Sequence, residues 1–338
     1  MIKLRKLATC ASVGAIAFAF ASEALAADVT WNASVWGKRR AFTEHLEFLS
    51  EKVKETTDGK FEIKIHYGGA ISKPRENLDG IAIGAFEMAQ FCASYHADKN
   101  PTLTVLELPF LGVNDLETEV KASWAVYNHP AVQKDLARWT ARVLMPSPMP
   151  QYNILGAGDA PTAISDFAGM RVRALGGIGK AMETVGAVPT SVTASEAYQA
   201  LDSGTVRAVA FAPHAHLAFK TIEAGKWWTT NLNPGTVQCP IVINTDAYDA
   251  LPDDFKKALD GAVQPAIDHY LATYAKVFDK WYPEMKKLGI EQITYSDEEL
   301  AAFKSKAGKP LWDQWVADNT AKGLPAQELL DLVLETIK

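Results

Sequence analysis

The sequence is poor in cysteine, has no surplus of basic residues and contains none of the common local catalytic motifs. Three cysteines in 338 residues, with no Cys-x-x-Cys pair, argue against a zinc site and against a dense disulfide framework. Thirty-four Lys and Arg against 40 Asp and Glu give a net charge of -6, which argues against a dedicated nucleic-acid binder. The 48% of hydrophobic residues and 22% of charged residues are typical of a folded chain with sizeable cores.

Motifs for catalysis, nucleotides and metals are absent or incomplete. There is no Gly-x-Ser-x-Gly elbow and no His-Glu-x-x-His pair. The glycine-rich stretch 176–180 differs from a phosphate loop, because Ala174 stands where its first Gly belongs and Ala181 where Ser or Thr belongs. We interpret it as a turn into a helix. His214 and His216 have no third ligand nearby, so we predict no metal, no cofactor and no enzymatic activity.

The first 26 residues have the layout of a secretory signal peptide. Three basic residues lie among the first six, residues 7–20 are apolar or small, and residues 24–26 form a small-x-small cleavage pattern. A membrane anchor is the alternative, but the apolar run is shorter than the roughly 20 residues that a span requires. We expect cleavage before Ala27 and a periplasmic mature protein.

The remainder of the chain alternates between strand patterns and helix patterns. The first half has strand patterns at 29–33, 61–67 and 86–92, separated by helix patterns at 39–56 and 75–83. After three prolines between 146 and 150 the alternation resumes, with strand patterns at 171–175, 190–192, 208–211 and 239–244 and helix patterns at 179–185 and 195–201. This order predicts an α/β fold with parallel strands, and a domain crossing near 150–155.

A long helical pattern follows the last of these strands. Residues 254–288 have apolar side chains at helical spacing, and Pro265 and Pro283 are expected to interrupt or kink the helix. Such a helix is long enough to run across two lobes. Two shorter helices are expected at 297–306 and 326–337. A secreted chain with two α/β lobes and no catalytic signature suggests a binding protein with a cleft.

Six stretches resemble one family of binding proteins and occur in the family's order. They are 106–111, 166–173, 186–190, 195–201, 204–206 and 244–252. The stretch 166–173, Asp-Phe-Ala-Gly-Met-Arg-Val-Arg, is similar to the family pattern D-l-x-G-x-k-x-R. Together they resemble the substrate-binding proteins of tripartite ATP-independent periplasmic (TRAP) transporters, of the dicarboxylate-binding type.

The resemblance implies a two-lobe binding-protein fold with a hinge and a long helix that spans both lobes. On that basis we assign 27–153 and 239–280 to lobe I, and 154–238 and 281–338 to lobe II. The implied function is to capture a small carboxylate or zwitterion between the lobes and deliver it to one small and one large membrane subunit. A binding protein for an ATP-driven importer, a periplasmic sensor partner and a periplasmic enzyme are the alternatives.

The resemblance also places Arg173 where the family holds the carboxylate of its ligand. A guanidinium suits this role because its planar fork of donors matches a carboxylate and stays charged. A structural salt bridge is the alternative role for Arg173. Further ligand contacts are expected at strand ends and lobe crossings, at Trp36, Cys92, Tyr95, Phe211, His214 and Gln238.

Two questions stay open at this level. Cys92 and Cys239 both lie in apolar runs, so they form either one disulfide or two buried thiols. Many relatives have a second basic residue in the crossing segment, but residues 152–163 contain no Lys or Arg. That absence favours a monocarboxylate or an ectoine-like zwitterion, although Arg39, Arg40 or Arg75 could supply a second cation from the first lobe.

Overall fold

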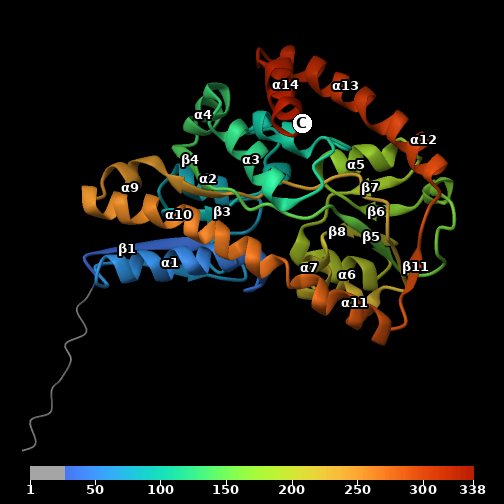
Figure 1. The fold of residues 1–338 in the computed structure, drawn as a ribbon, viewed down its shortest axis with the longest axis horizontal. Helices are drawn as coiled ribbons and strands as arrows, with labels where there is room; N and C mark the ends of the chain where they lie inside the picture. The colour runs from blue at the N-terminus through green and yellow to red at the C-terminus, as the bar shows by residue number, and fades with distance from the viewer. Residues whose placement is uncertain (1–26) are drawn as a thin grey trace, which may run out of the picture.

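The structure, a computed structural model, describes residues 27–338 and contains two β-sheets with helices packed around each (Figure 1). The expected signal peptide, 1–26, lies outside these residues. Within 27–338, no helix combines the length and apolar character that crossing a bilayer requires. The predicted two-lobe α/β architecture is therefore confirmed, with one lobe for each sheet.

The first sheet has the strand order β2-β1-β3-β10-β4. β1 pairs in parallel with β2 and β3, as the predicted β-α-β-α-β order requires, and β10 pairs antiparallel with β3 and β4. Its strands and two main helices are β1 (Val29–Ser34), β2 (Phe61–His66), β3 (Met88–Gln90), β4 (Ala141–Met145), β10 (Ile241–Asn244), α1 (Glu44–Thr56) and α2 (Asn77–Ala82). The chain thus returns to lobe I after building lobe II.

The second sheet has the order β11-β9-β5-β8-β6-β7. β6 pairs in parallel with β7 and β8, whereas β5 runs antiparallel to β8 and β9. Its elements are β5 (Asn153–Gly156), β6 (Arg171–Arg173), β7 (Val188–Thr190), β8 (Ala208–Phe211), β9 (Trp227–Thr229), β11 (Glu291–Ile293), α5 (Gly176–Glu183), α6 (Ala197–Asp202), α7 (Pro213–Ala218) and α8 (Thr221–Ala224). The short parallel strands end toward lobe I and carry Arg173 and Phe211 to the lobe interface.

Three connections join the lobes: β4 to β5, β9 to β10, and α10 (Asp253–Tyr274) to α11 (Val277–Lys287). The expected helix over 254–288 does cross both lobes, but as two helices that part at residues 275–276. Pro265 and Pro283 both lie inside helices, so neither causes the break. The break falls where the chain leaves α1 of lobe I and begins to pack on α7 of lobe II.

The amphipathic faces of α1 and α10 explain how the pair α10 and α11, called the spine below, attaches to lobe I. α1 turns Leu46, Leu49 and Val53 inward at helical spacing, and α10 presents Leu259 and Ala266 to the same core. All five side chains are buried, and each large one contributes roughly 1.5–3 kcal/mol of hydrophobic stabilisation. This packing holds α10 firmly on lobe I.

The C-terminal segment changes one proposed lobe boundary. It forms α12 (Asp297–Ala307), α13 (Lys309–Thr320) and α14 (Ala326–Thr336). Leu329, Leu330 and Val333 of α14 join the lobe I core with Ala122 and Val126 of α3 (Leu116–Tyr127). We therefore propose that 326–336 belongs to lobe I, which adds a fourth connection between the lobes, from α13 to α14, and keep the other boundaries as proposed. The remaining elements are η1 (Ala41–Thr43), η2 (Ala93–Tyr95), η3 (Pro101–Glu107), α4 (Pro130–Ala137), η4 (Ile164–Phe167), η5 (Ala194–Glu196) and α9 (Thr245–Asp249).

Candidate functional site

A small closed cavity lies between the two lobes. Its volume, about 20 Å³ measured to the centre of a water-sized sphere, is room for roughly one water molecule. Its walls are mainly aromatic and come from both lobes: Trp36, Phe42, Tyr95, Tyr152, Phe211 and Phe219. A solute of several heavy atoms can therefore enter only if the lobes move apart or the lining side chains rearrange.

The structure brings six of the seven sequence-predicted site residues to this cavity. They are Trp36, Cys92, Tyr95, Arg173, Phe211 and His214. The seventh, Gln238, is buried but does not line the cavity. That these residues bind a ligand stays a prediction, and the geometry below shows what each could do.

Arg173 ends β6 with its guanidinium buried at 1% exposure. Its Nε donates to the carbonyl oxygen of Val192 at 2.9 Å and its Nη1 to that of Ala210 at 3.1 Å. Its Nη2 donates to the Tyr95 hydroxyl of the opposite lobe at 3.3 Å, and its Cζ lies 4.4 Å from the Phe211 ring centre. These neutral partners fix the orientation of the guanidinium without neutralising its charge, so it is positioned to receive an anion.

Arg40 is a second guanidinium at the same cavity, contributed by lobe I. It is 9% exposed, and its Cζ lies 4.9 Å from the ring centre of Trp36 and 5.3 Å from that of Phe219. Nη1 donates to the Lys38 carbonyl at 2.7 Å. Within residues 27–338, Nε and Nη2 have no hydrogen-bond partner. Burial lowers the pKa of Arg40 to about 10, which leaves it charged at neutral pH.

Aromatic contacts close the cavity from lobe to lobe. Trp36 of lobe I stacks on Phe219 of lobe II with ring centres 6.1 Å apart. Phe42 stacks on His214 at 5.3 Å, across the same interface. Such flat, apolar walls suit the body of a planar or cyclic solute.

The two histidines have different partners. Nδ1 of His214 contacts the Tyr274 hydroxyl on the spine, whereas Nδ1 of His216 lies 2.7 Å from Thr221 Oγ1. Burial lowers the pKa of His216 to about 3, with Arg173 as a smaller cause, and lowers that of His214 well below its ordinary value, with Arg40 as a smaller cause. Both imidazoles are therefore neutral, and only His214 faces the cavity.

Cys92 and Cys239 are joined in a disulfide, which resolves the alternative left open by the sequence. The bond joins the segment that follows β3 to the connection between β9 and β10, beside the cavity. A structural disulfide is consistent with an oxidising compartment.

Gln238 belongs to a buried polar cluster beside the lobe connections. Its Nε2 donates to Glu119 Oε1 at 2.9 Å, and its backbone N–H donates to Glu107 Oε1 at 2.9 Å. Met149 N–H donates to the other oxygen of Glu119, and Ser94 Oγ donates to that of Glu107. Burial raises the pKa of Glu107 to about 7 and that of Glu119 to about 8. Neighbouring side chains of an extended segment point to opposite sides, so Gln238 lies in this cluster and Cys239 lies at the cavity.

The glycine-rich turn has a packing role at the lobe interface. A Cβ on Gly177 would lie 2.0 Å from the Glu107 backbone oxygen, and one on Gly176 would lie 2.4 Å from Glu107 Oε2. Only glycine permits α5 of lobe II to approach η3 of lobe I this closely. Trp228 lines a separate hollow of about 690 Å³ beside the lobe connections.

A two-lobe fold with a cation-bearing, aromatic cavity at its interface defines the class of a solute-binding protein. The chain matches the family described as bacterial extracellular solute-binding protein, family 7 (DctP), over residues 32–319. Because the match spans most of the chain, the protein belongs to that family, as the sequence stretches predicted.

Curated relatives and solved structures resemble nearly the whole chain. The C4-dicarboxylate-binding periplasmic protein DctP of Rhodobacter capsulatus is 25% identical over 270 residues, 77% of each chain. A monocarboxylate 2-oxoacid-binding periplasmic protein of a Nostoc species is 22% identical and covers 86% of this chain and 84% of its own. A TRAP solute-binding protein from an unidentified marine microbe, specific for aromatic acids, has a TM-score of 0.82 at 21% identity, covering 92% and 98%.

Proposed function

We propose that this chain is the periplasmic receptor of a TRAP transporter, which binds a small carboxylate in the interlobe cavity and delivers it to the membrane subunits. The observation that carries the proposal is Arg173: a buried guanidinium at the cavity whose three protein partners are all neutral. The named ligands of its relatives are a C4-dicarboxylate, 2-oxoacids and aromatic acids, and all of these are carboxylates.

Rotation of the lobes about their connections provides the mechanism. In the open state Arg173 is accessible on lobe II, and a carboxylate can pair with it bidentately. Closure then brings Tyr95 and Trp36 of lobe I over the solute and expels water, which strengthens the ion pair in the less polar surroundings. The membrane subunits would recognise the closed conformation.

The experiment is a thermal-shift screen followed by calorimetry on Arg173 variants. We expect organic acids to raise the melting temperature, because they bind only the native state. Arg173→Gln should weaken binding by at least about 100-fold, equivalent to ~3 kcal/mol. Arg171→Gln is the matched control, since Arg171 lies on the same strand but is exposed and bonds only to Thr205 and Gly204 carbonyls. Affinity of Arg173→Gln equal to that of the control would refute the assignment.

A binding protein and an enzyme on this fold make different predictions for the fate of the solute. We expect mass spectrometry to recover the bound acid chemically unchanged after release from the protein. Conversion of the acid during incubation would instead favour the enzyme.

A further inference from the structure

Arg40 is a buried charge whose bonding capacity is mostly unused. Only Nη1 finds a partner, the Lys38 carbonyl, while Nε and Nη2 have none among residues 27–338. A guanidinium has five N–H donors, and burying such a group without partners costs far more than leaving it in water. Arg173, by contrast, has three donors engaged.

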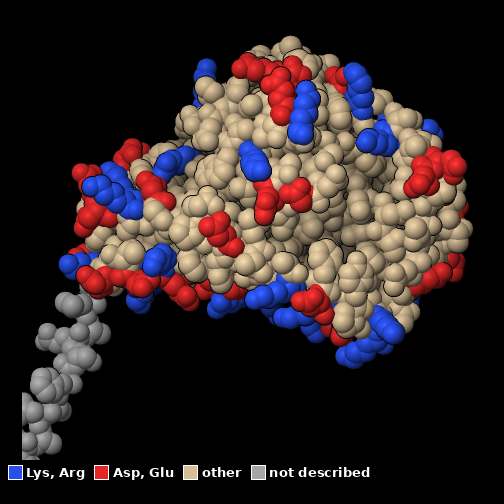
Figure 2. Space-filling view, in the orientation of Figure 1, with Lys and Arg blue, Asp and Glu red and all other residues tan. Residues whose placement is uncertain are grey.

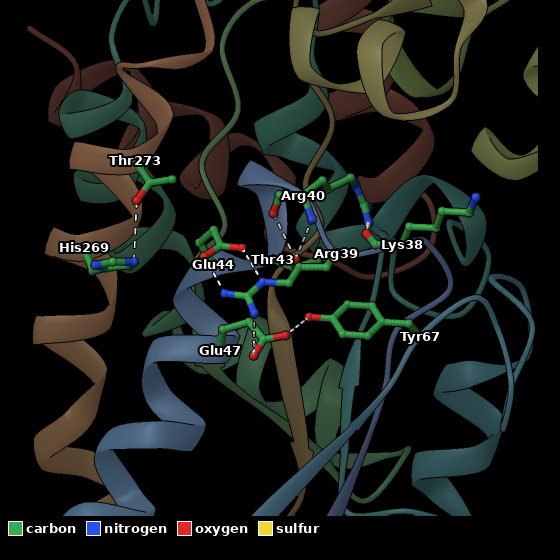
Figure 3. Close-up of polar contacts among 9 residues, drawn as sticks. All are labelled: Lys38, Arg39, Arg40, Thr43, Glu44, Glu47, Tyr67, His269 and Thr273. Atoms are coloured by element: carbon green, nitrogen blue, oxygen red, sulfur yellow. Dashed lines mark hydrogen bonds and ion pairs between the residues drawn. The ribbon is translucent and has the colours of Figure 1, made fainter.

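The carboxylates near Arg40 in sequence are paired with its neighbour. Arg39 Nε lies 2.9 Å from Glu44 Oε1, and Arg39 Nη1 lies 3.8 Å from Glu47 Oε2. Figure 3 shows Arg39 directed at these two acids and Arg40 turned away from them toward Lys38. Burial is the main influence on the pKa of Arg40, and tyrosines, among them Tyr270 and Tyr95, act on it more weakly.

Arg40 also stands between the cavity and a basic groove on the surface. It lines both the closed cavity and a hollow of about 530 Å³, and His214 is the other side chain that the two share. Lys276 and Lys280, both exposed, line the outer part of the hollow. Figure 2 shows Lys and Arg side chains beneath the junction of α10 and α11, with Asp and Glu side chains beside them along the same lower edge. The charged side chains of this hollow are four cations, Arg39, Arg40, Lys276 and Lys280, and one carboxylate, Glu44, which is paired with Arg39.

We propose that Arg40 is a second anion-binding residue of the cleft, supplied by the first lobe, and that it recognises a second acidic group on the solute where the cavity meets the basic groove. This assignment rests on the proposed function, because it takes Arg173 as the first anchor. It also supplies the second cation that the crossing segment 152–163 lacks.

The charge balance of the closed cavity leads to a preference between solutes. Arg40 and Arg173 give it two positive charges, and no carboxylate side chain lines it. A singly charged acid would leave one buried guanidinium unpaired, whereas a doubly charged acid pairs with both. The two anchors lie on opposite lobes, so the second pair forms only on closure.

Calorimetry on two pairs of acids tests this preference. The probes are 3-hydroxybenzoate with benzene-1,3-dicarboxylate, and butyrate with succinate, because each pair differs by one carboxylate. We expect the dianion of at least one pair to bind the wild type at least ten-fold more tightly than its monoanion. Arg40→Gln should abolish that preference while monoanion affinity changes less than three-fold, and Arg171→Gln should preserve it.

The outcomes separate this inference from the proposed function. Binding that depends on Arg173 but shows the same preference in Arg40→Gln as in the wild type would overturn the role of Arg40 alone. A wild-type preference for the monoanions would do the same. Failure of all four acids to bind the wild type would count against the carboxylate function and this assignment together.

The stability of the ligand-free protein provides a second readout. If Arg40 serves the ligand, Arg40→Gln should keep or raise the urea midpoint, because it removes a buried charge that lacks partners. If Arg40 instead holds the fold together, the midpoint should fall well below that of Arg171→Gln, and the proposal would be wrong.

Discussion

The two buried charged regions at the lobe interface are satisfied in opposite ways. Beside the lobe connections, each oxygen of Glu107 and Glu119 accepts a hydrogen bond, from Gln238 or from neighbouring donors. At the cavity, Arg40 keeps two nitrogens without partners. Both regions are buried to a similar degree, so burial alone does not distinguish them.

The difference separates a structural role from a binding role. A saturated acid cluster has no capacity left for an outside group, and it holds η3, α3 and the second connection together. A guanidinium with free donors can complete its bonding only with a group that the folded chain does not supply. The unused donors of Arg40 are therefore the reason to assign it a binding role rather than a structural one.

The Cys92–Cys239 disulfide joins the two regions, and its loss should have the largest effect on stability. It closes a loop of 147 residues, so removing it should lower the free energy of unfolding by about 3–5 kcal/mol. Urea unfolding of the reduced protein and of the double variant Cys92→Ala/Cys239→Ala measures this loss. Coinciding curves for oxidised and reduced protein would show that the bond contributes nothing.

The acid cluster should reveal itself in the dependence of stability on pH. Because the folded-state pKa values of Glu107 and Glu119 are raised to about 7 and 8, the folded protein holds protons that the unfolded chain releases near pH 4.5. The two protonated carboxyls contribute to the free energy of unfolding in full below about pH 4.5, and this contribution is lost as pH rises to 8.

Each carboxyl should contribute a slope of up to about 1.4 kcal/mol per pH unit within that window. Glu119→Gln should remove the contribution of Glu119 to this slope. The difference in free energy of unfolding between wild type and variant should therefore shrink steadily from pH 5 to pH 8. The buried histidines affect both proteins alike and cancel in this difference. Parallel pH profiles, measured by urea unfolding, would show that Glu119 does not titrate in this way.

The smallest effect is expected at the rim of the cleft, where Arg75 of lobe I contacts lobe II. Its Nη2 donates to the Ser191 carbonyl at 2.9 Å and to Ser191 Oγ at 2.8 Å. The contact is exposed, so Arg75→Ala should cost the closed state only about 0.5 kcal/mol. Small-angle scattering should detect a slightly larger radius of gyration than in Arg171→Ala, whose lost bonds lie within lobe II. Equal radii of gyration in the two variants would show that the contact between Arg75 and Ser191 does not hold the lobes together.

Sequence reasoning located the site better than it assigned partners within it. Arg173 and Phe211 are predicted through the family resemblance, and the structure brings both to the cavity because their strands end at the lobe interface. Gln238 is predicted at the ligand because it lies at the second crossing between the lobes, but alternation along an extended segment turns it away from the cavity that Cys239 lines. Arg40 was one of three possible cations, and only its missing partners distinguish it from Arg39 and Arg75.

The sequence by itself determined the alternation of strands and helices, the acidic balance with few cysteines and the family, since these depend on local periodicity and on the order of motifs. The tertiary structure decided the disulfide, the break in the spine at 275–276, the place of α14 on lobe I and the unpaired guanidinium of Arg40. These features depend on which distant residues meet, because sequence order alone does not say which groups folding buries or which partners it gives them.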